Sequence, residues 1–334
     1  MRLSRNLRAI VLVTETIMSR AFIFALLIST FAISLFGQSD PINVETNLVT
    51  MNVAVTDKSG KYVHGLKQED FSVMDGNQKR QIEFFSSKDD ALSIGIVYDM
   101  HEMDEQALNV LEALKRFTSR FGPKDDYFVT VFNERGSITS DFVPDPDQLR
   151  RHLADPEKGT PKALYDAIVD AGDRVKKLRN AKKYLIVFSD GADRNSYHSM
   201  KDLKIRLRSI NLPLYSLVFR DDVQNISYTD IGRNGPREYF RTGEATELDR
   251  SVVAELSKST GGAAYESSIR NRVYLAALAT KFLDEARSQY VVGFSPDDGD
   301  GRWHKLKITV IGDKGNGLKV SSRDGYLSPA KARQ

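Results

Sequence analysis

The sequence predicts an α/β protein with a doubly wound, mostly parallel sheet, together with a small β-sandwich-like domain that strands from both ends of the chain build. Three observations predict this class. Short apolar runs alternate with helical stripes through the middle of the chain. Strand-like alternation of apolar and polar residues is confined to the two flanks. The composition, 41% hydrophobic and 28% charged over 334 residues, is that of a globular protein.

Charge and cysteine content exclude several classes of function. The chain has no cysteine, which excludes disulfides, thiolate zinc sites, iron–sulfur clusters and a cysteine nucleophile. Four arginines and one acid, Glu15, precede Gly37 and account for the whole formal charge of +3. The neutral remainder lacks the field that drives nucleic-acid binding, so we predict no nucleic-acid partner. A mean hydropathy of -0.37 and a single long apolar run exclude a polytopic membrane protein.

The N-terminal segment predicts export. Residues 21–36 form an uncharged apolar run, with Arg20 before it and Gly37 and polar residues after it. We expect a signal peptide over residues 1–37, with Met18 as an alternative start. In the other interpretation the segment stays uncleaved and anchors the chain, which is the only membrane contact we expect. Without a cysteine the chain is not a bacterial lipoprotein, and we expect a periplasmic or secreted protein.

Residues 44–88 are predicted to form an N-terminal β segment. Apolar residues alternate from Val49 to Val55, and Asp75-Gly76 lies between two short runs as a hairpin signal. The segment is too short to bury much of a core alone. Four of its apolar residues are expected to share one face: Phe71, Val73, Ile82 and Phe84.

Residues 90–287 are predicted to form the doubly wound, Rossmann-like domain. Ligands of such domains bind at the carboxyl ends of the strands. The helix near 200 has a capping box, because Ser199 is followed by Asp202 three residues later. The expected strands cover residues 93–98, 127–132, 184–188 and 214–219. The expected helices cover residues 107–121, 164–178, 200–210, 248–256 and 273–287.

Residues 288–328 are predicted to form a C-terminal β segment that pairs with the N-terminal one. Strand patterns are found at residues 290–294, 303–311 and 318–320. Before this segment, residues 220–247 have glycines, charges and no periodicity, which predicts a long loop. Its aromatic and arginine residues are of types enriched at protein interfaces, which makes the loop a candidate partner surface.

Three oxygen-bearing side chains are expected at the carboxyl edge of the sheet. Asp99 ends one predicted strand, Asp190 ends another, and Thr160 precedes the most regular helix. Two carboxylates and a hydroxyl are hard oxygen ligands suited to Mg²⁺ or Mn²⁺. In the simplest alternative, Asp99 and Asp190 cap helices and hold loops.

Four motifs in order resemble the von Willebrand factor A-type domain: GIVYD, PKDDYFVTVFN, GTPKALYDAI and YLIVFSDGADRNS. The flanking pieces VAVTDKSGKYVHGLKQEDFSVMDGNQKRQIEFFS and SQYVVGFSPDDGDGRWHKLKITV are similar to exported von Willebrand factor A-related proteins of acidobacteria. The resemblance runs from about Val44 to the C-terminus. It implies a central, mostly parallel sheet covered by helices on both faces.

The resemblance also implies a metal-ion-dependent adhesion site, in which an Asp-x-Ser-x-Ser strand end, a threonine and a second aspartate hold a divalent cation. Asp99, Thr160 and Asp190 match the two aspartates and the threonine. The two serines are replaced by His101 and Met103. Because a thioether and an imidazole suit Mg²⁺ poorly, we expect a degenerate site.

The same edge is expected to contact a partner through four residues: His101, Met103, Asp104 and Asp193. Asp104, like Glu102, is either a compensating carboxylate for a cation or a first-turn acid that the helix dipole favours.

Catalytic motifs are missing from the sequence. It has no GxxxxGK[ST] loop, no GxSxG elbow, no glycine-rich dinucleotide fingerprint after the first strand and no HExxH pair. We therefore expect a non-enzymatic, exported adhesion-type module that binds a protein or cell-envelope partner. The alternatives are a metal-dependent hydrolase that uses Asp99 and Asp190, and an envelope scaffold whose edge is inert.

Overall fold

The computed structural model describes residues 48–87, 90–100, 104–133, 136–153, 163–193, 196–219, 228–232, 235–239, 247–267, 272–296 and 299–328. They belong to one compact unit, Asn47–Gln334. The expected signal peptide and the alternative start at Met18 lie outside the described residues. Within these described ranges, no helix has both the length and the apolar character that a membrane span requires.

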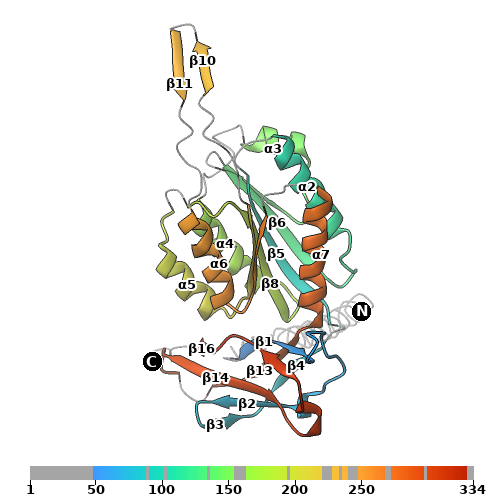
Figure 1. The fold of residues 1–334 in the computed structure, drawn as a ribbon. Coiled ribbons are helices and arrows are strands. Elements are labelled where there is room, and N and C mark those ends of the chain that lie inside the picture. Colours follow the sequence, from blue (N-terminus) through green and yellow to red (C-terminus); the bar gives the residue numbers. More distant parts are fainter. Residues whose placement is uncertain are drawn as a thin grey trace, which may run out of the picture. The chain divides into compact units, whose positions relative to one another are not determined.

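A six-stranded sheet forms the centre of the unit (Figure 1). Its order is β12-β9-β8-β5-β6-β7, and every pairing is parallel except that of β6 with β7. The pairing starts at β5 and reverses direction there, which is the order of a doubly wound fold. The strands are β5 (Leu92–Asp99), β6 (Asp126–Asn133), β7 (Gly136–Ser140), β8 (Lys182–Ser189), β9 (Leu214–Phe219) and β12 (Ala264–Ser267).

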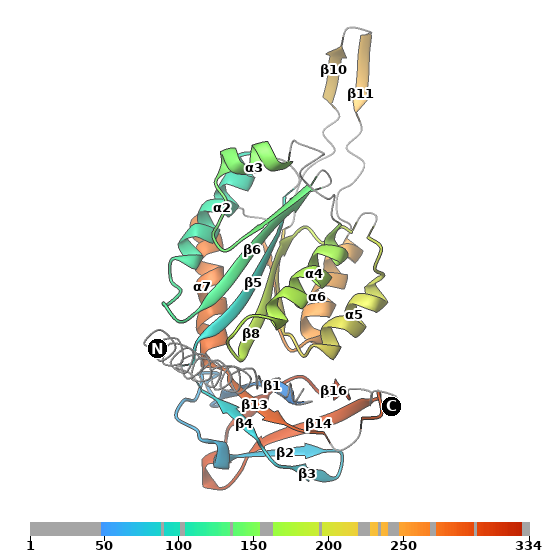
Figure 2. The same ribbon diagram turned by 180° about the vertical axis from the view of Figure 1, so that it is seen from behind.

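Helices cover both faces of this sheet (Figure 2). One apolar cluster packs α2 and α7 against one face, and a second packs α4, α5 and α6 against the other. Every residue of β5 is buried, as expected for a strand between two helical layers. The fold class predicted for the middle of the chain is therefore confirmed. The helices are α2 (Glu105–Thr118), α3 (Pro146–Leu153), α4 (Leu164–Lys176), α5 (Met200–Ser209), α6 (Glu247–Ser259) and α7 (Arg272–Ser288).

Two antiparallel four-stranded sheets contain strands from both flanks of the chain, in the orders β15-β1-β13-β4 and β16-β14-β2-β3. In the first, Val53 of β1 is opposite Tyr290 of β13. A third apolar cluster fills the space between the sheets. The pairing of N- and C-terminal strands is confirmed. The strands are β1 (Val49–Thr56), β2 (Phe71–Asp75), β3 (Gln78–Arg80), β4 (Phe84–Ser86), β13 (Tyr290–Phe294), β14 (Trp303–Val310), β15 (Lys319–Ser321) and β16 (Gly325–Leu327).

The hairpin expected at Asp75-Gly76 joins β2 to β3, and Gly76 has the positive φ of 57° that such a turn favours. One expectation for this segment is wrong. Phe84 is only half-buried and lies outside the apolar cluster, whereas its neighbour Phe85 packs on Phe71 with ring centroids 5.6 Å apart. The stretch before β4 shifts the alternation by one residue, and this shift moves Phe85 to the core face.

The long loop predicted over residues 220–247 contains two strands that the sequence did not indicate. Strands β10 (Tyr228–Gly232) and β11 (Gly235–Tyr239) pair as an antiparallel hairpin within it. The hairpin residues alternate too irregularly for sequence patterning to reveal the strands. The aromatic and arginine side chains considered there as a partner surface lie outside what the structure describes.

Candidate functional site

Asp99 and Asp190 lie at the carboxyl ends of neighbouring parallel strands. Tyr98 of β5 is opposite Phe188 of β8, so Asp99 and the Ser189-Asp190 pair follow at the same edge of the sheet. In the sheet, β6 lies on one side of β5 and β8 lies on the other. This is the switch point at which doubly wound folds bind ligands.

A serine joins the two strand ends. Ser189 Oγ donates to Asp99 Oδ2 at 2.8 Å and accepts from Gly191 N at 2.9 Å. Asp190 Oδ1 accepts from Ala192 N at 2.9 Å. Asp99 is 9% exposed and Asp190 6%. Buried polar groups of this kind fix the start of the β8–α5 loop, because each would be costly to leave without a partner.

Gly191 permits the sharp departure of this loop from the sheet. Its φ is 91°, a conformation that residues with a side chain rarely adopt. The glycine of the SDG sequence therefore has a geometric role.

Asp104, one of the expected edge residues, is the N-cap of α2. Its Oδ1 accepts from Ala107 N at 2.8 Å. This bond satisfies one of the amide groups that the first turn of a helix leaves open. The three residues before it, which include His101 and Met103, lie outside the described residues, as does Thr160.

Asp193, the other described edge residue, caps a different helix across space. Helix α4 begins after Ala163, which has no side chain that could cap it. Asp193 Oδ1 instead accepts from Tyr165 N at 3.0 Å and from Ser196 Oγ at 2.6 Å. Ser196 Oγ in turn accepts from Asp166 N at 3.3 Å. The β8–α5 loop thus supplies the N-terminal cap of α4.

A second clamp holds the following residues of the same loop. Asp166 of α4 accepts from Tyr197 N at 2.9 Å and from His198 N at 3.1 Å, and its Oδ1 is 2.6 Å from His198 Nδ1. Burial acts to raise the pKa of Asp166, but these hydrogen bonds outweigh it and lower the pKa below its ordinary value. Sequence reasoning missed this clamp, because no local pattern links a helix residue to a loop 31 positions later.

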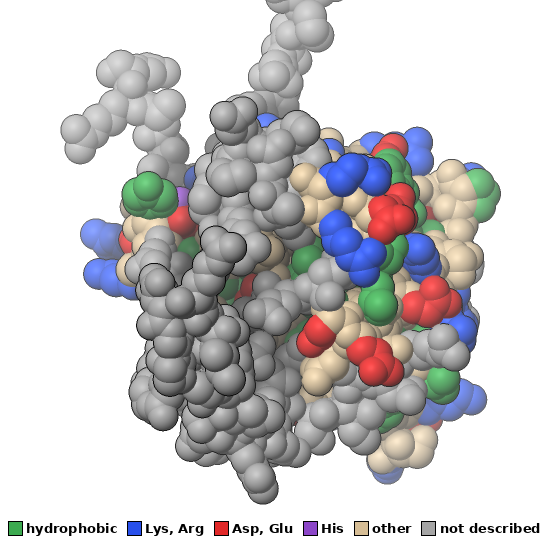
Figure 3. Space-filling view, turned by 90° about the horizontal axis from the view of Figure 1, so that it is seen from above, with side chains coloured by type: hydrophobic (Ala, Val, Ile, Leu, Met, Phe, Trp, Pro, Cys, Tyr) green, Lys and Arg blue, Asp and Glu red, His purple; other side chains and the backbone are tan. Residues whose placement is uncertain are grey.

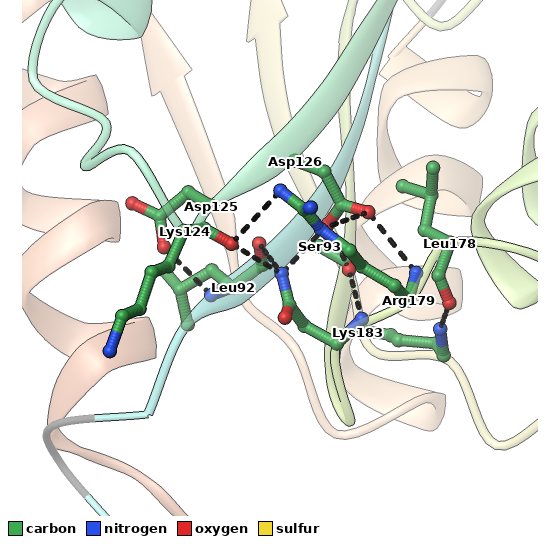
Figure 4. Close-up of polar contacts among 9 residues, drawn as sticks. Leu92, Ser93, Lys124, Asp125, Asp126, Leu178, Arg179 and Lys183 are labelled. Atoms are coloured by element: carbon green, nitrogen blue, oxygen red, sulfur yellow. Dashed lines mark hydrogen bonds and ion pairs between the residues drawn. The ribbon is translucent and has the colours of Figure 1, made fainter.

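Another polar network lies at the opposite, amino end of the sheet (Figure 4). Asp125 accepts from Leu92 N at 2.8 Å and from Gly122 N at 2.7 Å. Asp126 accepts from Ser93 Oγ and, at 3.1 Å, from Arg179 N. These bonds tie loop backbone to strand starts, which indicates a structural role for that end.

The oxygen ligands at the carboxyl edge are of the type that a hard divalent cation prefers, but the described residues supply too few of them for a complete coordination shell. Asp99, Asp190 and Ser189 offer carboxylate and hydroxyl oxygens, the ligands that Mg²⁺ and Mn²⁺ prefer. Among the described residues, no group of three or more His, Asp or Glu side chains lies close enough to hold a metal ion. An octahedral shell would therefore need Thr160, residues of the 101–103 segment or water.

Figure 3 views the molecule from above. Outside the grey area, the side chains that are coloured by type include acidic and basic groups next to one another, with apolar groups between them.

Comparison with known proteins gives distant structural likenesses only. No family model matches the chain, and no curated protein matches it. An aerotolerance-related membrane protein from Bacteroides fragilis, with multiple mutations to serine, is 14% identical, with a TM-score of 0.38 over 59% of this chain and 98% of its own.

Two further solved structures are similar at the same level. The conserved hypothetical protein BatB from Bacteroides thetaiotaomicron is 14% identical, with a TM-score of 0.36 over 59% of this chain and 100% of its own. The manganese-loaded TRAP protein of Plasmodium vivax is 12% identical, with a TM-score of 0.35 over 72% of this chain and 96% of its own. These identities and TM-scores are low, so the fold is assigned from the strand order and packing described above.

Proposed function

We propose that this protein is an exported, non-enzymatic interaction module that binds a protein or cell-envelope partner through the carboxyl edge of its six-stranded sheet. One observation carries the proposal. Two buried aspartates, Asp99 and Asp190, end adjacent strands at the switch point of a doubly wound sheet, and Ser189 connects the first to the loop that follows the second. Ligands of such sheets bind at this place.

The clamps around the edge support a binding role because they lower the entropy cost of association. The β8–α5 loop is held to α4 through Asp193, Ser196 and Asp166. A loop that is ordered before a partner arrives loses less conformational freedom on binding.

A divalent cation, Mg²⁺ or Mn²⁺, is the proposed cofactor of this edge. Asp99, Asp190 and Thr160 would hold it, and the cation would supply positive charge for a carboxylate of the partner. His101 and Met103 stand where hydroxyl donors would strengthen the site, so we propose weak binding.

A second candidate function, an envelope scaffold with an inert edge, is favoured by the roles of Asp104 and Asp193. Both carboxylates cap helices. In this case the sandwich would make the partner contacts, and the aspartates would serve the fold alone.

Export to the periplasm or the outside of the cell is proposed from the N-terminal apolar run. The missing catalytic motifs support a role without catalysis, and the formal neutrality of the chain after Gly37 supports a role without nucleic-acid binding. A metal-dependent hydrolase remains the enzymatic alternative. It would require turnover that Asp99→Asn abolishes.

Calorimetric titration of the purified protein with Mg²⁺ and Mn²⁺ tests the proposed edge. We expect weak, saturable binding that Asp99→Ala abolishes and that the exposed-site control Asp313→Ala retains. Thermal unfolding of both variants checks that they are folded. If neither ion binds the wild type, the metal mechanism is wrong and the inert scaffold becomes the better description.

A further inference from the structure

The outer face of one sandwich sheet carries three lysines. Alternate residues of β14 are buried in the sandwich core, so Lys305 and Lys307 point outward from the same strand. Lys307 is opposite Met74 of β2, and Met74 is opposite Lys79 of β3. All three lysines are exposed. They form one cationic patch across three neighbouring strands, which we call the lysine face.

Acids of the same strands do not compensate the charge of the lysine face. Asp75 of β2 points inward, where it accepts from Arg80 Nη2 at 2.9 Å. Among the described residues, none forms an ion pair or a hydrogen bond with the ammonium group of any of the three lysines. An anionic surface would complement this local excess of positive charge. The other outward positions of β2 and β14 are uncharged: Ser72, Met74, Trp303 and Thr309.

The length of chain before β1 brings the lysine face within reach of a bilayer. In the interpretation in which the apolar run of residues 21–36 stays uncleaved, residues 37–48 are the link between that run and the sandwich. A link of this length spans at most about 40 Å when fully extended. Strands β2 and β3 lie on the side of the sandwich away from the helical layers (Figures 1 and 2).

The apolar run also gives a reason for a second membrane contact. It is shorter than the about 20 residues that a typical membrane span needs. A weak anchor becomes stable when a basic patch adds its attraction to anionic lipid. The lysine face supplies such a patch in the first folded part of the chain after the run.

We propose that the lysine face lies on the surface of a bilayer that contains anionic phospholipid, with residues 21–36 inserted in the same bilayer. The ammonium groups of Lys79, Lys305 and Lys307 approach the lipid phosphates. The inference shares with the proposed function only the premise of export. It leaves Asp99 and Asp190 available to a partner, because both belong to the six-stranded sheet and not to the sandwich.

Energy transfer from tryptophan to a lipid with a dansyl-labelled headgroup tests the proposal. Trp303 is the single tryptophan of the chain and occupies an outward position of β14, two residues before Lys305. The full chain is reconstituted into vesicles of phosphatidylcholine alone and into vesicles that also contain phosphatidylglycerol. We expect transfer to be at least about twofold more efficient in the anionic vesicles, and high salt should remove the difference by screening exposed charges.

Matched variants separate the lysine face from general effects of charge. Replacing all three lysines of the face with glutamate should give the same low transfer in both kinds of vesicle, and replacing them with glutamine should give an intermediate result. Asp99→Ala should keep the wild-type difference. Thermal unfolding checks that each variant is folded. A control variant, which should also keep the difference, has glutamate at three exposed lysines of the helical layers: Lys115, Lys201 and Lys258.

Two results would overturn the proposal. The first is equal transfer in the two kinds of vesicle for the wild type, or equal losses in the lysine-face and control variants. The second is loss of the difference when soluble polyglutamate is added at the same concentration of negative charge as the lipid, which would assign the face to acidic polypeptides. Either result leaves the proposed function standing, because cation binding at Asp99 is measured separately by calorimetry.

Discussion

Individual carboxylates fix the loops above the sheet, and each one does so by accepting backbone N–H groups. Asp104 caps its own helix, Asp193 caps a helix from another loop, and Asp166 holds two consecutive amides of that loop. Only the first is a local arrangement. An aspartate just before a helical stripe predicts an N-cap, whereas the other two depend on which loop the fold places beside α4.

Removing the cap that Asp193 provides should destabilise the protein. Asp193→Ala leaves the amide of Tyr165 without its acceptor and releases Ser196 Oγ, which we expect to cost about 1 kcal/mol. Urea unfolding measures the change in the free energy of unfolding. Asp313→Ala, at an exposed site, serves as the control, and equal stability of the two variants would contradict the assigned role.

The pKa of Asp166 predicts a specific acid sensitivity. Since this pKa is lowered in the folded state, the ionised carboxylate stabilises the fold above the ordinary pKa of 3.8, and this contribution is lost as the pH falls below that value and through the lowered folded-state pKa. The stability difference between the wild type and Asp166→Asn should therefore shrink between about pH 5 and pH 3. Thermal unfolding of both proteins across that pH range tests this prediction. A stability difference that stays constant would show that the charge of the Asp166 carboxylate does not stabilise the fold.

At the scale of secondary-structure elements, the close packing of a helix on the sheet depends on a single residue. A Cβ atom added to Gly95 of β5 would lie 2.5 Å from Val175 of α4 and 2.8 Å from Phe128 of β6. The absence of a side chain there lets α4 approach the sheet. The sequence shows Gly95 only as a gap in an apolar strand, and its role depends on a helix some 80 residues later.

Gly95→Ala should lower the free energy of unfolding by about 2 kcal/mol, because overpacking forces neighbours out of their rotamers. Gly122→Ala is the matched control. A Cβ atom at Gly122 would meet Asp125 Oδ2 at 3.6 Å, an ordinary contact. Chemical denaturation of the two variants should give a clear difference, and the prediction fails if they lose the same amount.

Strand β14 contains His304, whose contribution to stability changes with pH in the direction opposite to that of Asp166. His304 Nδ1 is 3.3 Å from Asp75 Oδ1, and its Nε2 is 3.1 Å from Asp300 Oδ1. Burial acts to lower the pKa of His304, but the two carboxylates outweigh it and raise the pKa above 6.5.

The stabilisation from protonated His304 is fully present below pH 6.5 and is lost as the pH rises through the raised folded-state value. The stability advantage of the wild type over His304→Gln should therefore decline from about pH 6 to pH 8. Thermal melts in matched buffers measure this trend. If the stability advantage of the wild type instead grew with pH, the contacts assigned to His304 would be contradicted.

At the scale of the whole described unit, buried Arg323 joins the sandwich to the helical layers. Its Nε donates to Met51 Sδ at 3.0 Å in β1, and its terminal nitrogens donate to Arg208 O at 3.4 Å and to Asn211 Oδ1 beside α5. Burial lowers the pKa of Arg323 to about 9, so the guanidinium stays charged at neutral pH. Trp303 adds a second contact, with the Arg208 guanidinium 4.9 Å from its ring centroid.

Arg323→Ala should uncouple the two parts and cost about 2 kcal/mol, the scale of hydrogen bonds to a charged group. The single tryptophan, Trp303, reports on the sandwich, while far-UV circular dichroism reports mainly on the helices. Wild type and the exposed control Arg302→Ala should give coincident urea transitions by both probes. In Arg323→Ala the transitions measured by the two probes should separate. Coincident transitions in this variant would contradict the role of Arg323 in joining the sandwich to the helical layers.

Long strands could be predicted from the sequence, whereas several short ones could not. Strands β5, β6, β8 and β9 have six to eight residues with apolar runs long enough to be recognised. Strands β12 and β16 have four and three residues, and edge strand β7 is mostly polar, so their pairing depends on neighbours that only the fold supplies. The same limit applies to the site. Asp99 and Asp190 could be placed from strand ends, whereas the link through Ser189 required the register of β8.

The pairing of β1 with β13 has a consequence for the order in which the protein is made. Asn52 and Gln289 meet although 237 positions separate them in the chain. A ribosome delivers β1 to β4 first, then the whole helical layer, and only then the strands that complete both antiparallel sheets. The helical layer can therefore fold from contacts among its own residues while β1 and β4 stand unpaired and the β2–β3 hairpin lacks β14. Their apolar faces and open edges are then exposed to aggregation during synthesis. The last strands to emerge close the sandwich, so its assembly is the late step.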